Sequence, residues 1–222
     1  MRMKLADREL PDYTKGEEIF NMVSHIAGGA FAVVALVLCV VKAAISGDVW
    51  AIVSGAVYGV TMVVLYCMSS IYHGLRPSLG KKVLQVLDHC SIYFMIAGAY
   101  TPIVLCAFRP LYPVLAWSIF GFEWTLTAVA VTLNAIDLRE FRVFSMVCYI
   151  LMGWGIVLAF PYAVRALTPA GFWLLLSGGL AYTVGAVLYG IGSKKRWFHC
   201  MFHVFVLVGS VLQFISIYLY TM

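Results

Sequence analysis

The sequence predicts an all-α integral membrane protein with seven transmembrane helices. Its 222 residues are 63% hydrophobic and 11% charged, whereas a soluble domain is about 45–50% apolar and about 25% charged. Apolar runs of transmembrane length follow one another, and the basic residues gather in the short connections between them. The net charge of +5 therefore serves as a topology signal and does not indicate nucleic-acid binding. We expect a multi-pass protein of a cell membrane, with membrane lipid as its partner.

Each predicted span satisfies the need for roughly 20 mostly apolar residues. The spans are Ile19–Ile45, Val49–Leu75, Val86–Ala107, Tyr112–Leu133, Val143–Val164, Pro169–Gly190 and Trp197–Tyr220. The connections are short, so consecutive helices should be antiparallel neighbours. A tail of residues 1–17 precedes one transmembrane domain of residues 18–222, and the first residues carry no apolar core typical of a secretory signal.

Small residues at helical spacing predict close approaches between helices. They occur as Gly55-x-x-x-Gly59, Gly178-Gly179 and Ala181-x-x-x-Gly185. Pro102 lies inside the third span, where it should kink the helix and leave a backbone carbonyl in need of another partner.

Basic residues predict the orientation. Twelve of the fifteen fall in the tail and after the second, fourth and sixth spans: Arg2, Lys4, Arg8, Lys15, Arg76, Lys81, Lys82, Arg139, Arg142, Lys194, Lys195 and Arg196. Only Lys42, Arg109 and Arg165 fall on the other side. Because Lys and Arg remain cytoplasmic, the N-terminus should be inside and the C-terminus outside.

With this topology all five histidines lie at the cytoplasmic end. Ser69 and His73 stand one helical turn apart, and so do His199 and His203, so each pair shares a helix face. Strongly polar residues in membrane helices are costly and usually mark function. Three neutral imidazoles suit Zn²⁺ and leave its fourth position open. We therefore predict that His73, His199 and His203 bind zinc.

The other two histidines have a simpler interpretation. A lone His near a helix end is more often an interfacial or hydrogen-bonded residue than a ligand, so His25 and His89 are not assigned to the metal. His25 belongs instead to a polar stripe along the first helix, together with Glu17, Asn21 and Ser24.

Two residues are candidates for catalysis. Asp88 could take a proton from a zinc-activated water and pass it to a leaving group; its alternative role is a helix N-cap. Ser69 could orient the water or an oxyanion; its alternative is a hydrogen bond to the backbone carbonyl four residues earlier. A site of this kind inside a bilayer favours a substrate with an apolar tail.

The remaining reactive side chains receive no role in the zinc site. The cysteines are interpreted as buried thiols, and Cys200 points about 100° away from His199 on the helix. Glu123 lies near mid-bilayer and should face the bundle or be protonated. The cysteines are Cys39, Cys67, Cys90, Cys106, Cys148 and Cys200.

These residues in combination resemble the hemolysin III family, the bacterial branch of the progestin and adipoQ receptor (adiponectin receptor) superfamily. The motifs are Glu17-x-x-x-Asn21-x-x-Ser24-His25, Ser69-x-x-x-His73, Asp88-His89-x-x-Ile92-Tyr93-x-x-Ile96-Ala97-Gly98-x-Tyr100-Thr101-Pro102 and His199-x-x-x-His203.

The resemblance covers nearly the whole chain and implies a location in the bacterial cytoplasmic membrane. It implies zinc near the cytoplasmic surface on His73, His199 and His203, with Asp88 and Ser69 beside the bound water. Many hemolysin III sequences carry a further His where this chain has Gln213, far from the predicted ligands.

Three functions are compatible with these features. The first is a zinc-dependent hydrolase of a lipid amide or ester, as the ceramidase-like activity of the receptor branch implies. The second is a membrane-perturbing or pore-forming hemolysin, which the concentration of polar residues at one end disfavours. The third is a receptor or regulator of lipid homeostasis with structural zinc.

Overall fold

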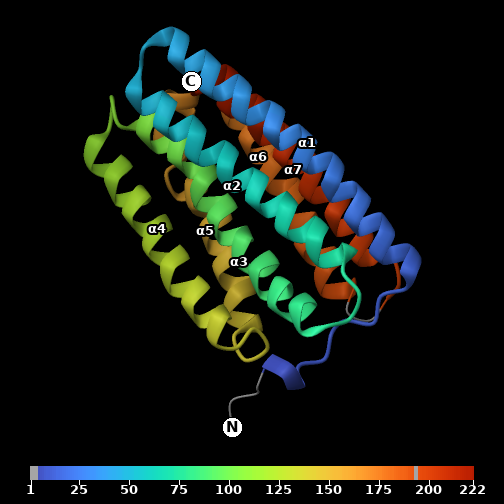
Figure 1. Ribbon diagram of the computed structural model, residues 1–222. Helices are drawn as coiled ribbons and strands as arrows, with labels where there is room; N and C mark the ends of the chain where they lie inside the picture. Colours follow the sequence, from blue (N-terminus) through green and yellow to red (C-terminus); the bar gives the residue numbers. More distant parts are fainter. Residues whose placement is uncertain (1–4, 193–194) are drawn as a thin grey trace.

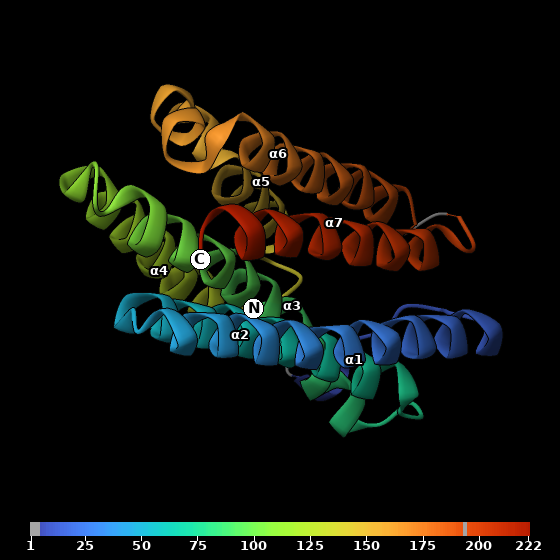
Figure 2. The ribbon, with the colours of Figure 1, turned by 90° about the horizontal axis from the view of Figure 1, so that it is seen from above.

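The computed structural model describes residues 5–192 and 195–222, and all regular structure in these residues is helical. Seven α-helices are present, as predicted. The elements in chain order are η1 (Leu5–Asp7), α1 (Lys15–Ser46), α2 (Val49–Gly74), α3 (Leu79–Pro102), η2 (Ile103–Phe108), α4 (Pro113–Ile136), α5 (Arg142–Leu158), α6 (Phe160–Gly192) and α7 (Phe198–Tyr220). They form a bundle with the two chain ends at opposite ends (Figure 1), and the view from above shows α7 between α6 and α1 (Figure 2).

Six of these helices are long and apolar enough to cross a membrane. The exception, α5, has 17 residues, which is at the lower limit of about 17–25 for a spanning helix. Large apolar side chains are well exposed on the outside of the bundle, including Ile45 at 83%, Val114 at 81% and Leu158 at 90%. Such a surface fits lipid and not water, so the chain is an integral membrane protein.

The fifth and sixth helices differ from the predicted spans. The span expected over Val143–Val164 is interrupted at Ala159, and the chain resumes helical structure with Phe160 and Pro161. Proline lacks an N–H and disfavours α geometry in the residue before it, so α5 ends there. A second break follows at Thr168, which directly precedes Pro169 and has a φ of 62°.

The third helix begins earlier than the predicted Val86 and changes geometry after Pro102. Ser78 caps it by accepting a hydrogen bond from the Lys81 N–H at 3.2 Å. Asp88 therefore lies well inside α3, and its alternative role as an N-cap is wrong. Beyond Pro102 the helix continues as a π-helix, η2, which fits the expected disturbance by proline.

The predicted small-residue contacts are confirmed at Gly59 and Gly178 but not at Gly179, where nothing lies within 4 Å of an added Cβ. A Cβ atom on Gly59 of α2 would lie 2.7 Å from the Leu36 Cα of α1, and one on Gly178 of α6 would lie 3.0 Å from the Gly209 carbonyl oxygen of α7. These glycines let two helix pairs pack backbone to backbone.

One end of the bundle holds the beginnings of α1, α3, α5 and α7 and the ends of α2, α4 and α6; we call it the histidine end. Nine of the predicted cytoplasmic basic residues lie there, whereas Arg2, Lys4 and Lys194 fall outside the described residues. Lys42, Arg109 and Arg165 belong to the opposite half of the bundle. The histidine end is thus the basic end.

This charge distribution predicts the orientation in the membrane. A reporter fused before Met1 should report the cytoplasm, and one fused after Met222 the opposite side. The measurement is paired alkaline phosphatase and green fluorescent protein fusions, which are active on opposite sides. Cytoplasmic signals from both termini would contradict the orientation.

The close approach of α1 and α2 predicts a stability effect. Gly59→Ala should destabilise the protein by about 1–3 kcal/mol, the usual cost of overpacking, because the Leu36 backbone cannot move out of the way. Gly121→Ala is the matched control, since nothing lies within 4 Å of a Cβ there. Unfolding of both variants in mixed micelles measures the difference, and equal stability would argue against this close contact.

Candidate metal centre and cavity

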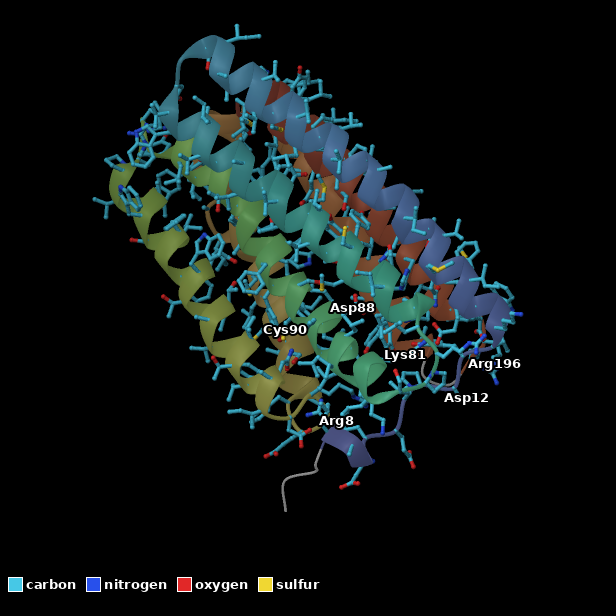
Figure 3. The ribbon with its side chains drawn as sticks, viewed as in Figure 1. Arg8, Asp12, Lys81, Asp88, Cys90 and Arg196 are labelled. Carbon is cyan, nitrogen blue, oxygen red and sulfur yellow. The ribbon has the colours of Figure 1, made fainter. Side chains whose placement is uncertain are left out.

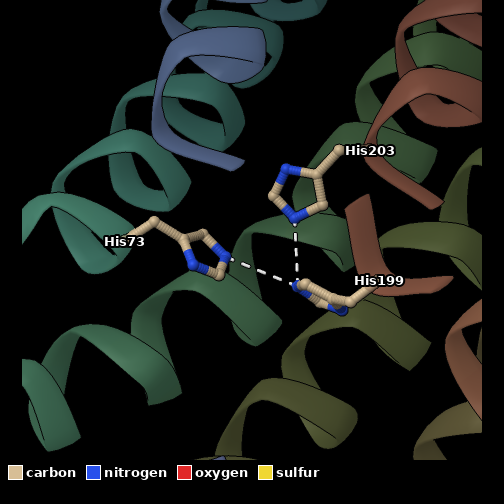
Figure 4. A group of neighbouring side chains, drawn as sticks. All are labelled: His73, His199 and His203. Atoms are coloured by element: carbon tan, nitrogen blue, oxygen red, sulfur yellow. Dashed lines mark hydrogen bonds between the residues drawn. The ribbon is translucent and has the colours of Figure 1, made fainter. Parts of the chain in front are cut away.

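Three histidine side chains converge at the histidine end. His73 comes from the last turn of α2, and His199 and His203 come from the beginning of α7. The Nε2 atom of His199 lies 3.4 Å from that of His73 and 3.1 Å from that of His203 (Figure 4). All three residues are buried, and one ligand atom from each lies within 4.8 Å of the others.

This arrangement fits a divalent metal ion. A proton can bridge only two ring nitrogens at a time, whereas one cation can accept lone pairs from all three. Imidazole nitrogens bind zinc, copper, iron and nickel. In the described part of the chain these are the residues that can hold a metal ion, and they are the three predicted from the sequence.

Glu17 fixes the beginning of α7 relative to α1. Its carboxylate accepts a hydrogen bond from the Trp197 N–H at 2.6 Å and one from the Thr14 N–H at 2.8 Å, and it pairs with Arg196 at 3.4 Å. Trp197 has a φ of 66°, so the chain turns sharply there and enters α7 with His199 already inside the bundle.

The rest of the helix-one stripe lies beside the cluster without joining it. The rings of His25 and His203 stack at 3.7 Å between centroids, with 24° between their planes. The His89 ring lies 6.0 Å from that of Tyr189. Neither histidine belongs to the three-histidine group.

Asp88 and Ser69 meet next to the cluster. The Ser69 hydroxyl is hydrogen-bonded to the Asp88 carboxylate, which also interacts electrostatically with His73. It is Ser70, and not Ser69, that donates to a carbonyl four residues earlier, that of Tyr66 at 2.7 Å. Both residues line the cavity described below, and Figure 3 shows Asp88 on α3 facing the interior of the bundle.

A cavity of about 980 Å³ runs from the cluster into the bundle. Its outer end is polar, with Asp88, His199 and His203 among its walls. Its other walls are mostly apolar and come from α2, α3, η2, α5, α6 and α7: Leu65, Met95, Ala99, Ile103, Ile156, Leu175 and Val206. The space therefore suits an amphiphile whose polar group reaches the histidines.

Two residues of the site were missed from the sequence. Tyr13 stacks on the His199 ring at 4.8 Å, and burial raises the pKa of its phenol, so it stays neutral. Glu18 contacts the His73 Nδ1 atom at 2.6 Å. Tyr13 precedes the first helix, so helical spacing does not connect it to the other site residues. Glu18 is adjacent to Glu17 but lies outside the polar stripe of the first helix, and its role becomes visible only from its contact with His73 on α2.

The side chains predicted to stay out of the site do so. Cys200 directs its thiol to the Glu17 carbonyl oxygen at 3.8 Å. All six cysteines are free, but Cys67 is exposed, which corrects its predicted burial: it lies on a helix face turned toward lipid. Glu123 has no exposed surface and faces the bundle, as expected.

Fold and site together define a multi-pass helical membrane protein with a three-histidine cluster at one end. The family model "Haemolysin-III related" matches residues 13–214. The chain belongs to the hemolysin III family.

Relatives span the same region. Identity is 36% to Hemolysin-3 of Bacillus cereus, covering 93% of this chain and 92% of that protein. It is 35% to the Hemolysin-3 homolog of Bacillus subtilis (strain 168), covering 94% and 96%. The human Monocyte to macrophage differentiation factor is 26% identical, covering 79% and 74%. The family membership and the apolar helices together show that the chain is a multi-pass protein of the bacterial cell membrane.

The cluster predicts the metal content of the purified protein. We expect about one zinc per chain, with most of it lost in His73→Ala, His199→Ala or His203→Ala. His25→Ala and His89→Ala are the controls and should keep more of it. Elemental analysis measures the content, and full zinc occupancy in His199→Ala would contradict a three-histidine site.

Proposed function

We propose that this protein is a zinc-dependent hydrolase that cleaves a lipid amide or ester within the membrane. The observation that carries the proposal is the position of the histidine cluster. It lies at the polar end of an apolar cavity, beside the Asp88 carboxylate and the buried Ser69 hydroxyl. A reactive polar group and a long hydrocarbon chain could both be accommodated there.

The chemistry would be divided between the metal and the protein. When bound by three neutral imidazoles, zinc would act as a Lewis acid and would lower the pKa of a bound water molecule to about 7. Asp88 accepts the proton lost by the attacking water and returns it to the departing amine or alkoxide. Ser69 donates to the Asp88 carboxylate and so keeps one of its oxygens pointed at the reaction centre.

The cavity walls would select the substrate. The apolar residues Met95, Ile103 and Leu175 would bind an acyl chain by burial of its CH₂ groups, at about 0.8 kcal/mol each. Tyr13 covers His199 from the tail side and would keep bulk water from the bond being cleaved. With the histidine end cytoplasmic, the polar part of the product would leave toward the cytoplasm.

A membrane-perturbing activity is the second candidate, and the names of the two Bacillus relatives favour it. The polar lining of the cavity is concentrated at the histidine end. A water-filled pore needs polar groups along its whole length, so this lining supports the hydrolase.

Asp88→Asn tests the proposal. The amide keeps the size of the carboxylate and can still bond to Ser69, but it cannot act as a base. We expect the variant to keep its zinc and to lose about a hundredfold or more of its lipid amide or ester turnover. Turnover is measured on purified protein in lipid, with and without a chelator.

Two results would count against this mechanism. Unchanged turnover in Asp88→Asn would remove Asp88 from it. If neither protein hydrolyses any lipid amide or ester, yet Asp88→Asn alters leakage from lipid vesicles, the membrane-perturbing function would replace the hydrolase.

A further inference from the structure

We infer that Glu18 is a positioning residue for the metal centre: it orients His73, and Lys81 holds Glu18 in place. This inference rests on the proposed metal site and adds a residue that neither the motifs nor the predicted ligand set contains. The three side chains come from three helices, with His73 on α2, Glu18 on α1 and Lys81 on α3.

The contact between Glu18 and His73 determines which ring nitrogen is free. The Glu18 Oε2 atom lies 2.6 Å from the His73 Nδ1 atom. A carboxylate can only accept a hydrogen bond, so Nδ1 must carry the proton. The lone pair is then on Nε2, the atom that lies 3.4 Å from the His199 Nε2. Metal-binding histidines are commonly oriented in this way, through the ring nitrogen that does not face the metal.

Each oxygen of Glu18 has its own partner. While Oε2 meets His73, Oε1 accepts from the Lys81 ammonium group at 2.6 Å. Lys81 also donates to the Leu75 carbonyl oxygen at 2.9 Å, just past the end of α2. The Glu18 carboxylate thus cannot rotate without breaking one of two short contacts.

The three side chains are largely shielded from solvent, so their charges must be balanced within the protein. The exposed fraction of the side chain is 0% for His73, 20% for Glu18 and 4% for Lys81. The positive charge of Lys81 compensates the negative charge of Glu18, so His73 meets a carboxylate without an unpaired charge entering the bundle. Figure 3 shows Lys81 at the histidine end, on the first turn of α3.

His73 is the only one of the three histidines on α2, whereas the other two share α7. A fixed His73 therefore defines where α2 meets the pair on α7, which is why its orientation should control metal affinity.

The test is the zinc affinity of Glu18→Gln, measured by chelator competition on purified protein. We expect the dissociation constant for zinc to rise about 10–100-fold, the usual effect of removing such a partner. Glu140→Gln is the matched control: it removes the same charge at the histidine end, from an exposed residue in the connection between α4 and α5. Its zinc affinity should change less than about threefold, well below the range for an orienting partner.

Two further measurements separate orientation from stability. Cobalt-loaded Glu18→Gln should show a changed visible absorption spectrum, and Glu140→Gln an unchanged one. Lys81→Met leaves Glu18 in contact with His73 but frees its second oxygen, so it should weaken zinc binding less than Glu18→Gln does. This variant also provides the test if Glu18→Gln fails to fold.

The outcomes are distinguishable. Wild-type affinity and spectrum in Glu18→Gln, with zinc lost in His199→Ala, would overturn the role of Glu18 and leave the metal site standing. Equal losses in Glu140→Gln and Glu18→Gln would make the effect one of charge and also overturn it. No zinc in the wild-type protein would remove the metal site and the role of Glu18 together.

Discussion

The junction between the beginnings of α1 and α7 is the interaction on which the site depends. Glu17, almost completely buried, joins the cap of α1 to the sharp turn at Trp197. Since α1 packs along α2 and α7 along α6, this junction sets the distance between the helix that carries His73 and the helix that carries His199 and His203. Without it, His73 and the pair His199 and His203 would belong to separate parts of the bundle.

A polar cluster inside a membrane protein must be satisfied internally, and here most of its partners come from neighbouring helices. His73 meets Glu18, Glu18 meets Lys81, and Ser69 meets Asp88. The cluster is therefore part of a network that ties α1, α2 and α3 together at one end. A metal ion would complete that network, because it takes up the lone pairs that the histidines direct at one another.

The irregular parts of the helices lie where the cavity is deepest. Tyr100 and Ile103, on either side of Pro102, line it, and so do Gly153 and Ile156 near the end of α5. The Tyr100 hydroxyl accepts a hydrogen bond from the Ile156 N–H at 2.8 Å. Broken helices in a membrane are tolerated where protein groups or a cavity take the freed backbone bonds.

The sequence by itself determined the class of fold, the number of helices and the three histidines. Apolar length and one-turn spacing are local properties, and the bilayer enforces them on each helix separately. The tertiary structure decided what lies opposite each residue. Asp88 lies inside α3 and not at its N-cap because α3 starts at Leu79. The fifth span ends before Phe160-Pro161. Glu18 and Tyr13 reach the cluster from the beginning of the chain. Such contacts join residues far apart in sequence, and no local periodicity records them, because they depend on how neighbouring helices are rotated and offset.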